Sequence, residues 1–150
     1  GDGSAVSSVA AWGVGRVGRD EEWRGRAEIV GSADVYNVLR GQMIDLPNEE
    51  FWVLLLNRAN RVIDTLRVSQ GGTSATVVDV KLVMRSALQQ LASALILCHN
   101  HPSNNLSPST ADDRVTGKIK SAAALFDIAV LDHIIVGEEG YFSYADEGRL

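Results

Sequence analysis

The segment that most restricts the fold is Leu95–Arg114, LILCHNHPSNNLSPSTADDR, where an apolar run ends in two histidines one residue apart. A short apolar run such as ALILCH indicates a buried strand. Pro102 has no amide proton and cannot continue strand pairing, so residues 103–107 are expected to form a loop. Helical periodicity resumes in STADDRVTGKIKSAAALF, with Ser109 at its start. The chain therefore has to place a buried strand, a polar loop and a helix in immediate succession.

The remaining sequence alternates between strand and helix patterns. We expect a strand at RAEIV (26–30), a helix at SADVYNVLRGQM with Ser32 as N-cap, and a hairpin within EEFWVLLLNRANRVIDTLRVS whose first strand is central. IAVLDHIIVG and GYFSYA indicate a last pair of strands. A core-facing helix is predicted from one apolar stripe: Val80, Val83, Met84, Ala87, Leu88 and Leu91. This order predicts an α/β layer sandwich, a mixed β-sheet flanked by helices.

Composition limits the domain count and the class of protein. A chain of 150 residues with 45% hydrophobic content can bury one core, so a single domain is expected at 26–150, and residues 1–25 are interpreted as a disordered tail, a linker remnant or an expression artefact. No apolar run is long enough for a membrane span, and Cys98 is the only cysteine, so a soluble, cytoplasmic protein is expected. The net charge of −5 argues against direct nucleic-acid binding.

The alternation of side chains along the strand brings His99 and His101 to one face, while Cys98 and Asn100 point to the other. Asp112 lies in the first turn of the following helix, and the loop is long enough to return its carboxylate to the two rings. Three such ligands with one open position are typical of catalytic zinc. Each residue also has an ordinary interpretation: hydrogen-bonded core histidines, and a capping box formed by Ser109 and Asp112.

The spacing His-x-His-x7-Ser-x2-Asp resembles the JAMM signature of the MPN-type metallohydrolases. The strings HNHPS, NEEFWVLLLNRANRVI, GGTSATVVDV and VLDHIIVG are similar to the bacterial RadC-type (UPF0758) branch of that superfamily, over about residues 29–150. The resemblance implies an MPN/JAMM-like, cytidine-deaminase-like layer sandwich. It also implies an N-terminal helix-hairpin-helix segment for which this chain has no room, so we expect the chain to be a domain of a longer protein.

The resemblance further implies a role for each site residue. His99, His101 and Asp112 match the zinc ligands, and Ser109 matches the serine that stabilises the oxyanion. The match to the family string ExFxVxLLN places the catalytic glutamate at Glu49. The adjacent Glu50 would point to the opposite face of the strand, so only one of the two acids can reach the metal. The implied reaction is zinc-dependent hydrolysis of an amide, either a peptide or an isopeptide bond.

The residues outside this set are interpreted mainly as structural. His133 is expected to be a core histidine or a partner of a ligand rather than a fourth ligand, and Asp132 should face the other way. Cys98, Phe51 and Trp52 are expected in the core, whereas Arg114, Lys118 and Lys120 should form a solvated helix face. Asn104 stands where RadC-type sequences commonly have glycine, and Asn tolerates the left-handed backbone that such a turn requires.

Three functions of different classes remain open at this point. The first is a zinc-dependent hydrolase acting on a protein or peptide. The second is a DNA-repair or recombination accessory module with little or no turnover. The third is a metal-stabilised interaction domain, which would need neither Glu49 nor Ser109. A homodimer is compatible with each of them.

Overall fold

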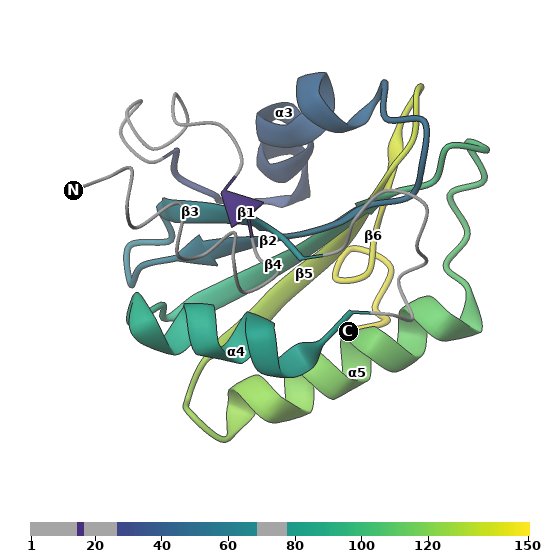
Figure 1. Cartoon of the computed structure of the whole chain (residues 1–150). Helices are drawn as coiled ribbons and strands as arrows, with labels where there is room; N and C mark the ends of the chain where they lie inside the picture. Colours follow the sequence, from purple (N-terminus) through teal and green to yellow (C-terminus); the bar gives the residue numbers. More distant parts are fainter. Residues whose placement is uncertain (1–14, 17–26, 69–77) are drawn as a thin grey trace.

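The computed structural model describes residues 15–16, 27–68 and 78–150 of the chain. The helices are α3 (Ser32–Met43), α4 (Val80–Gln89) and α5 (Thr110–Ala124). The strands are β1 (Gly15–Arg16), β2 (Phe51–Leu56), β3 (Val62–Arg67), β4 (Ala94–Asn100), β5 (Ala129–Val136) and β6 (Tyr141–Ser143) (Figure 1). None of the helices in these ranges combines the length and the apolar character that a membrane span needs.

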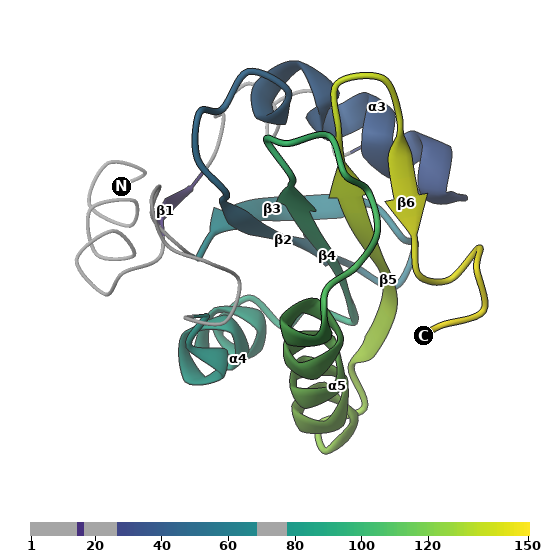
Figure 2. The ribbon, with the colours of Figure 1, turned by 90° about the vertical axis from the view of Figure 1, so that its right-hand side faces the viewer.

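The six strands form one mixed sheet in the order β1-β3-β2-β4-β5-β6. Only β4 and β5 run parallel; the other neighbours are antiparallel. A parallel pair needs a crossover connection, and α5 provides it between β4 and β5. Helix α3 covers one face of the sheet, and α4 and α5 cover the other (Figure 2). The predicted α/β layer sandwich with a mixed sheet is confirmed.

Strands β2 and β4 lie at the centre of the sheet and are buried along their whole length. Their uninterrupted apolar sequences are typical of strands that are covered on both faces. Alternate residues of these strands enter two separate cores. Phe51, Leu95 and Leu97 face α4 and α5. Trp52, Leu54 and Ile96 face α3. The hairpin β2–β3 and its central first strand are as the sequence predicts.

Two predictions at the first helix and first strand are wrong. The N-cap of α3 is Gly31, not Ser32, because the Asp34 carboxylate accepts hydrogen bonds from the backbone N–H groups of Val30 and Gly31, at 2.8 and 3.1 Å. The strand expected at 26–30 is reduced, within its described part, to an isolated bridge between Glu28 and Arg61.

The stripe predicted for the second helix is correct only in part. Val83, Met84 and Ala87 are buried, but Leu88 is 39% and Leu91 is 84% exposed. The helix ends at Gln89 and the backbone turns at Leu91, where φ is 53°, so the helical period no longer decides which way that side chain points. Of the tail expected at 1–25, only residues 15–16 are described, and they pair with β3; the rest lies outside the described residues.

Candidate metal centre

His99 and His101 lie at the carboxyl end of β4, where ligands commonly bind in α/β sheets. His99 is fully buried, and His101 is the first residue after the strand. Their side chains lie on the same face, as alternation predicts, and their Nε2 atoms are 2.8 Å apart. His101 stays close to the sheet because its backbone N–H donates to the carbonyl oxygen of Val136, at 3.1 Å.

Asp112 reaches the histidines from the first turn of α5. Its Oδ1 lies 3.2 Å from His99 Nε2, and its Oδ2 lies 3.4 Å from His101 Nε2. The same carboxylate accepts from the backbone N–H of Ser109 at 2.8 Å, while Ser109 Oγ accepts from the N–H of Asp112 at 3.0 Å. The capping box is therefore present together with the carboxylate–histidine contacts. Its two bonds hold the acid at the start of the helix.

Glu49 is brought to the same point by the register of β2 on β4. Phe51 is paired with His99, and Glu49, two residues earlier, points to the same side. Its Oε1 lies 3.8 Å from His99 Nε2 and 4.0 Å from His101 Nε2. Glu50 points away, since its Oε1 accepts from Trp52 Nε1 at 3.0 Å. Of the two adjacent acids, only Glu49 faces the histidines.

A second layer of polar side chains lies behind His99. His99 Nδ1 is 2.7 Å from His133 Nε2, and His133 Nδ1 is 2.5 Å from Thr116 Oγ1. His133 is fully buried and, as the sequence indicated, it contacts a predicted ligand. Thr116 was not singled out from the sequence. The available signal was its position four residues after Asp112, which places the two on the same side of α5.

The pKa values follow from burial and from these contacts. Burial raises the pKa of the Asp112 carboxyl, but the contacts with His101 and His99 and the hydrogen bond from the backbone N–H of Ser109 outweigh that effect and hold it well below its ordinary value. Burial lowers the pKa of His101, but the contacts with Asp112, Asn105 and Glu49 outweigh it and raise the pKa. The pKa of His133 is well below its ordinary value because the ring is desolvated, so this residue is neutral at physiological pH.

The four side chains suit a metal ion by donor type and by distance. Glu49, His99, His101 and Asp112 each offer one ligand atom, and these atoms all lie within 4.8 Å of one another. Ligand atoms of a tetrahedral zinc are roughly 3.4 Å apart, given metal–ligand bonds of about 2.0–2.2 Å. The two histidine–Asp112 separations, 3.2 and 3.4 Å, match this edge, whereas Glu49 lies beyond it. The two histidine Nε2 atoms are only 2.8 Å apart, so a small rotation of one ring is needed to bring them to the roughly 3.4 Å between two zinc ligands.

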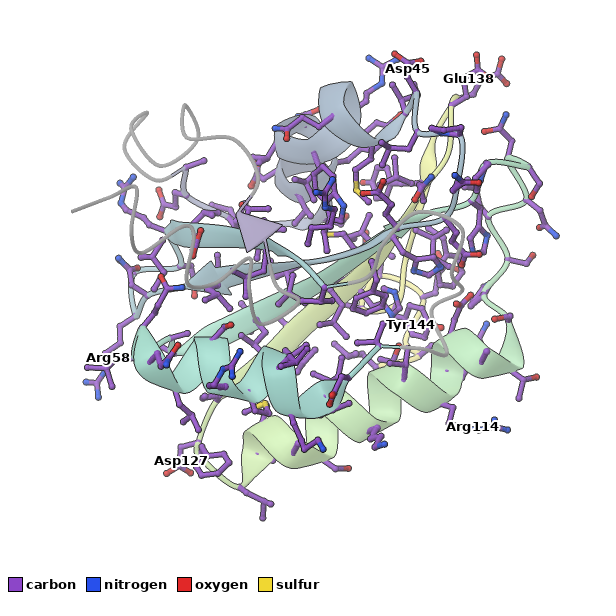
Figure 3. All side chains as sticks on the ribbon, viewed as in Figure 1. Asp45, Arg58, Arg114, Asp127, Glu138 and Tyr144 are labelled. Carbon is purple, nitrogen blue, oxygen red and sulfur yellow. The ribbon has the colours of Figure 1, made fainter. Side chains whose placement is uncertain are left out.

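The loop that connects the ligands is attached to the turn between β5 and β6. Asn104 adopts the left-handed conformation that the sequence suggested, with φ of 63°. Its Oδ1 accepts from the backbone N–H of Glu138 at 2.6 Å, and its Nδ2 donates to Glu138 Oε2 at 3.2 Å. Figure 3 shows Glu138 at the tip of this hairpin. Asparagine thus keeps the backbone of the turn and adds two bonds that glycine could not make.

Comparison with known proteins identifies the family. The model of the RadC-like JAB domain matches residues 29–149. A UPF0758 protein of Flavobacterium johnsoniae is 46% identical over 148 residues, which cover 99% of this chain and 65% of that protein. A UPF0758 protein of Porphyromonas gingivalis is 42% identical over 151 residues, which cover 100% of this chain and 66% of that protein. The chain thus spans slightly less than two thirds of the length of these relatives. The RadC-type resemblance is confirmed, and the chain belongs to the RadC-like JAB domain family as a UPF0758 member.

Proposed function

We propose that this domain is a zinc-dependent hydrolase of amide bonds, either peptide or isopeptide. The observation that carries the proposal is the difference in distance within the cluster. Asp112 stands 3.2 and 3.4 Å from the two histidine nitrogens, whereas Glu49 stands 3.8 and 4.0 Å from them. Two histidines and one carboxylate form a three-ligand site, and the more distant glutamate is placed to act on a water molecule.

The donor set supports zinc as the metal. Imidazole and carboxylate ligands suit zinc, and three protein ligands with an open position are typical of its catalytic sites. A bound zinc ion would supply Lewis acidity, which makes water a nucleophile near neutral pH and polarises a substrate carbonyl. His99, His101 and Asp112 would hold the ion.

Glu49 would act as general base and then as general acid. Its carboxylate is partly exposed, with a relative side-chain accessibility of 32%, so water and substrate can reach it. In this role it takes a proton from the attacking water and delivers it to the leaving amine. Glu50 cannot replace it, because its carboxylate is bonded to Trp52 on the other face of the strand.

Ser109 would donate a hydrogen bond to the oxyanion that develops on the substrate carbonyl. Its Oγ accepts from the N–H of Asp112 as the helix cap. That bond uses a lone pair and leaves the hydroxyl proton to be donated, so capping and oxyanion stabilisation are compatible.

Amide hydrolysis is favoured over phosphodiester cleavage by the surroundings of the cluster. Phosphoryl chemistry usually recruits two metals or a basic clamp. Within the described residues, Glu49, His99, His101 and Asp112 are the one group of four that could hold an ion, and residues 101–109 contain no Arg or Lys. Arg114 points away from the sheet (Figure 3).

The proposal is tested by metal content together with activity. Protein purified without chelator should contain about one zinc per chain, and it should cleave members of a mixed library of peptides and lysine-linked isopeptides. His101→Ala should lose both the zinc and the cleavage. Stoichiometric zinc in His101→Ala would overturn the ligand assignment. Stoichiometric zinc in the wild type without cleavage of any amide would favour the non-catalytic interaction domain.

A further inference from the structure

The buried pair behind His99 has a defined direction of hydrogen bonding. We propose that Thr116 and His133 are positioning residues that fix the tautomer of His99, so that its Nε2 presents a lone pair to the metal centre. This inference deepens the proposed function and rests on its metal site, but not on hydrolysis. No substrate contact is assigned to either residue.

The direction of the chain of bonds is set at Thr116. Its Oγ1 lies 2.7 Å from the backbone carbonyl oxygen of Asp112, four residues earlier on α5. A carbonyl oxygen can only accept, so the single hydroxyl proton of Thr116 is committed to this bond. Oγ1 also contacts the hydroxyl of Tyr144 and, at 2.5 Å, His133 Nδ1. Since the proton of Thr116 is used on the carbonyl oxygen, His133 Nδ1 must be the donor in its bond with Oγ1. His133 therefore carries its proton on Nδ1.

The same logic passes through His133 to the ligand. With its proton on Nδ1, a neutral imidazole has a lone pair on Nε2, and this atom lies 2.7 Å from His99 Nδ1. His99 consequently donates from Nδ1 and keeps a lone pair on Nε2. That lone pair is the one that faces the nitrogen of His101 at 2.8 Å and the carboxylate of Asp112 at 3.2 Å. A neutral imidazole binds a metal through this lone pair.

His101 is oriented in an independent way. Its Nδ1 donates to the backbone carbonyl oxygen of Asn105, which can only accept, so in the neutral ring the lone pair lies on Nε2, the atom that faces the centre. The loop thus fixes one ligand tautomer, and the core fixes the other. Thr116 links the His99 arrangement to the third ligand as well, since the oxygen to which it donates belongs to Asp112.

Packing buries the bonds between Thr116, His133 and His99. His99 and His133 are fully buried, and Thr116 is 4% exposed. The ring of Tyr144 stacks on His133 with centroids 4.7 Å apart and an interplanar angle of 6°, and Phe51 contacts the same ring edge-on at 5.5 Å. Thr116 also lines a pocket together with Tyr144 and Arg149. His99 and His133 have no exposed surface, so a reversed proton arrangement would leave a buried ring nitrogen unpaired.

The inference is tested with a matched pair of variants, Thr116→Val and Thr116→Ser. Valine has nearly the shape of threonine but no hydroxyl, whereas serine retains the hydroxyl. The zinc dissociation constant is measured by competition with a chromophoric chelator, and the unfolding midpoint is measured with excess chelator to confirm the fold. We expect Thr116→Val to bind zinc roughly 10–100-fold more weakly, and Thr116→Ser to retain wild-type affinity. Equal affinities of Thr116→Val and wild type would show that the hydroxyl has only a packing role.

A second measurement does not depend on any variant or on zinc. Nitrogen-15 NMR of the histidine rings in the zinc-free wild-type protein should show His133 protonated at Nδ1 and unprotonated at Nε2. The opposite tautomer would overturn the proposal. A protein that binds zinc, shows this tautomer and loses affinity in Thr116→Val, yet cleaves no amide, would refute hydrolysis while leaving the positioning role intact. If the wild-type protein cleaves amides but Thr116→Val binds zinc as tightly as wild type, hydrolysis is supported and the positioning role of Thr116 is refuted.

Discussion

At the scale of single residues, one carboxylate makes two sets of contacts that the sequence presents as alternatives. Asp112 accepts the N–H of Ser109 as part of a capping box and also faces both histidines. A carboxylate has two oxygens and about four lone-pair positions, so the tasks do not compete. The cap moreover fixes the acid in the orientation that a ligand needs. The capping box and the contacts with both histidines are therefore present together.

Glu49→Gln should retain zinc and the fold but lose most of the hydrolysis. Glu49 Oε1 is 3.8 and 4.0 Å from the histidine nitrogens, farther than the roughly 3.4 Å between two ligands of one zinc ion, so its proposed role is on water. Loss of general-base catalysis should lower kcat by about 10²–10⁴-fold. The measurements are zinc content and cleavage of the best peptide found in the library. Glu50→Gln is the matched control and should remain active, since its carboxylate faces Trp52. An inactive Glu50→Gln beside an active Glu49→Gln would contradict the strand register.

The raised pKa of His101 predicts a pH-dependent contribution to the stability of the metal-free protein. A group whose folded pKa lies above its unfolded value stabilises the fold below the unfolded pKa, about 6.5, and loses that contribution as the pH rises through the folded pKa. The difference in unfolding free energy between wild type and His101→Ala should therefore shrink on going from acidic to alkaline pH, with a slope of at most about 1.4 kcal/mol per pH unit.

The unfolding free energies of wild type and His101→Ala are measured by urea denaturation with excess chelator at a series of pH values from acidic to alkaline. Comparing the two proteins is necessary because the lowered pKa of His133 acts in the opposite direction, and this lowering, which is mainly due to burial, persists in His101→Ala. A difference that does not change with pH would show that His101 does not titrate as its contacts indicate.

At the scale of elements, the site is assembled by strand pairing. Parallel pairing of β4 with β5 requires the crossover helix α5, whose first turn carries Asp112 back to the end of β4. Antiparallel pairing of β2 with β4 brings the start of β2, and with it Glu49, to that same end. A shift of one residue in the second pairing would replace Glu49 by Glu50 at the centre. The connecting loop is held by its contacts with the β5–β6 turn.

Substitutions of Asn104 should separate the backbone and side-chain contributions to this loop. Asn104→Gly keeps the left-handed turn but loses two exposed bonds to Glu138, each worth about 0.5–1.5 kcal/mol. Asn104→Ala loses the same bonds and adds a left-handed penalty of roughly 1–2 kcal/mol. Unfolding free energies should therefore decrease in the order Asn, Gly, Ala. An alanine variant as stable as the glycine variant would show that the turn has relaxed to another conformation.

At the scale of the whole molecule, charge argues against nucleic acid as a direct partner. The net charge is −5, and the exposed basic residues of α5 include Arg114, Lys118 and Lys120, which lie on the helix rather than around the metal centre. Arg149 is paired with Asp113 at 2.9 Å, which removes another cation from this surface. Arg114 and Lys118 line one pocket on this helix, and Lys120 lines another that also contains Asp113, so the described cations do not form one continuous groove around the histidines.

We therefore expect the domain to bind duplex or branched DNA with a Kd weaker than about 1 µM at physiological salt, and not to cut it. Fluorescence anisotropy over a range of salt concentrations and a plasmid nicking assay check these two expectations. Tight, salt-sensitive binding, or nicking that disappears in His101→Ala, would favour a repair module over an amide hydrolase.

The local features of this protein could be predicted from the sequence, because they depend on covalent geometry. Strand alternation placed His99 and His101 on one face, and the run from Ser109 to Asp112 indicated the start of a helix. The RadC-type resemblance correctly indicated the family and named Glu49, which the residues alone could not distinguish from other acids. The apolar stripe predicted for α4 is wrong at Leu91, because the helix ends at Gln89 and the helical period no longer sets the direction of that side chain.

Only the tertiary structure decided the contacts between elements. The bonds from Thr116 to His133 and from His133 to His99 join α5, β5 and β4, and the residues involved are separated by 17 and 34 positions. The clamp between Asn104 and Glu138 also spans 34 positions. No local period encodes such contacts, because they depend on how strands are registered and how the helix packs on the sheet. The sequence by itself determined which side chains could hold a metal ion, and the packing of three elements decided which buried side chains contact them.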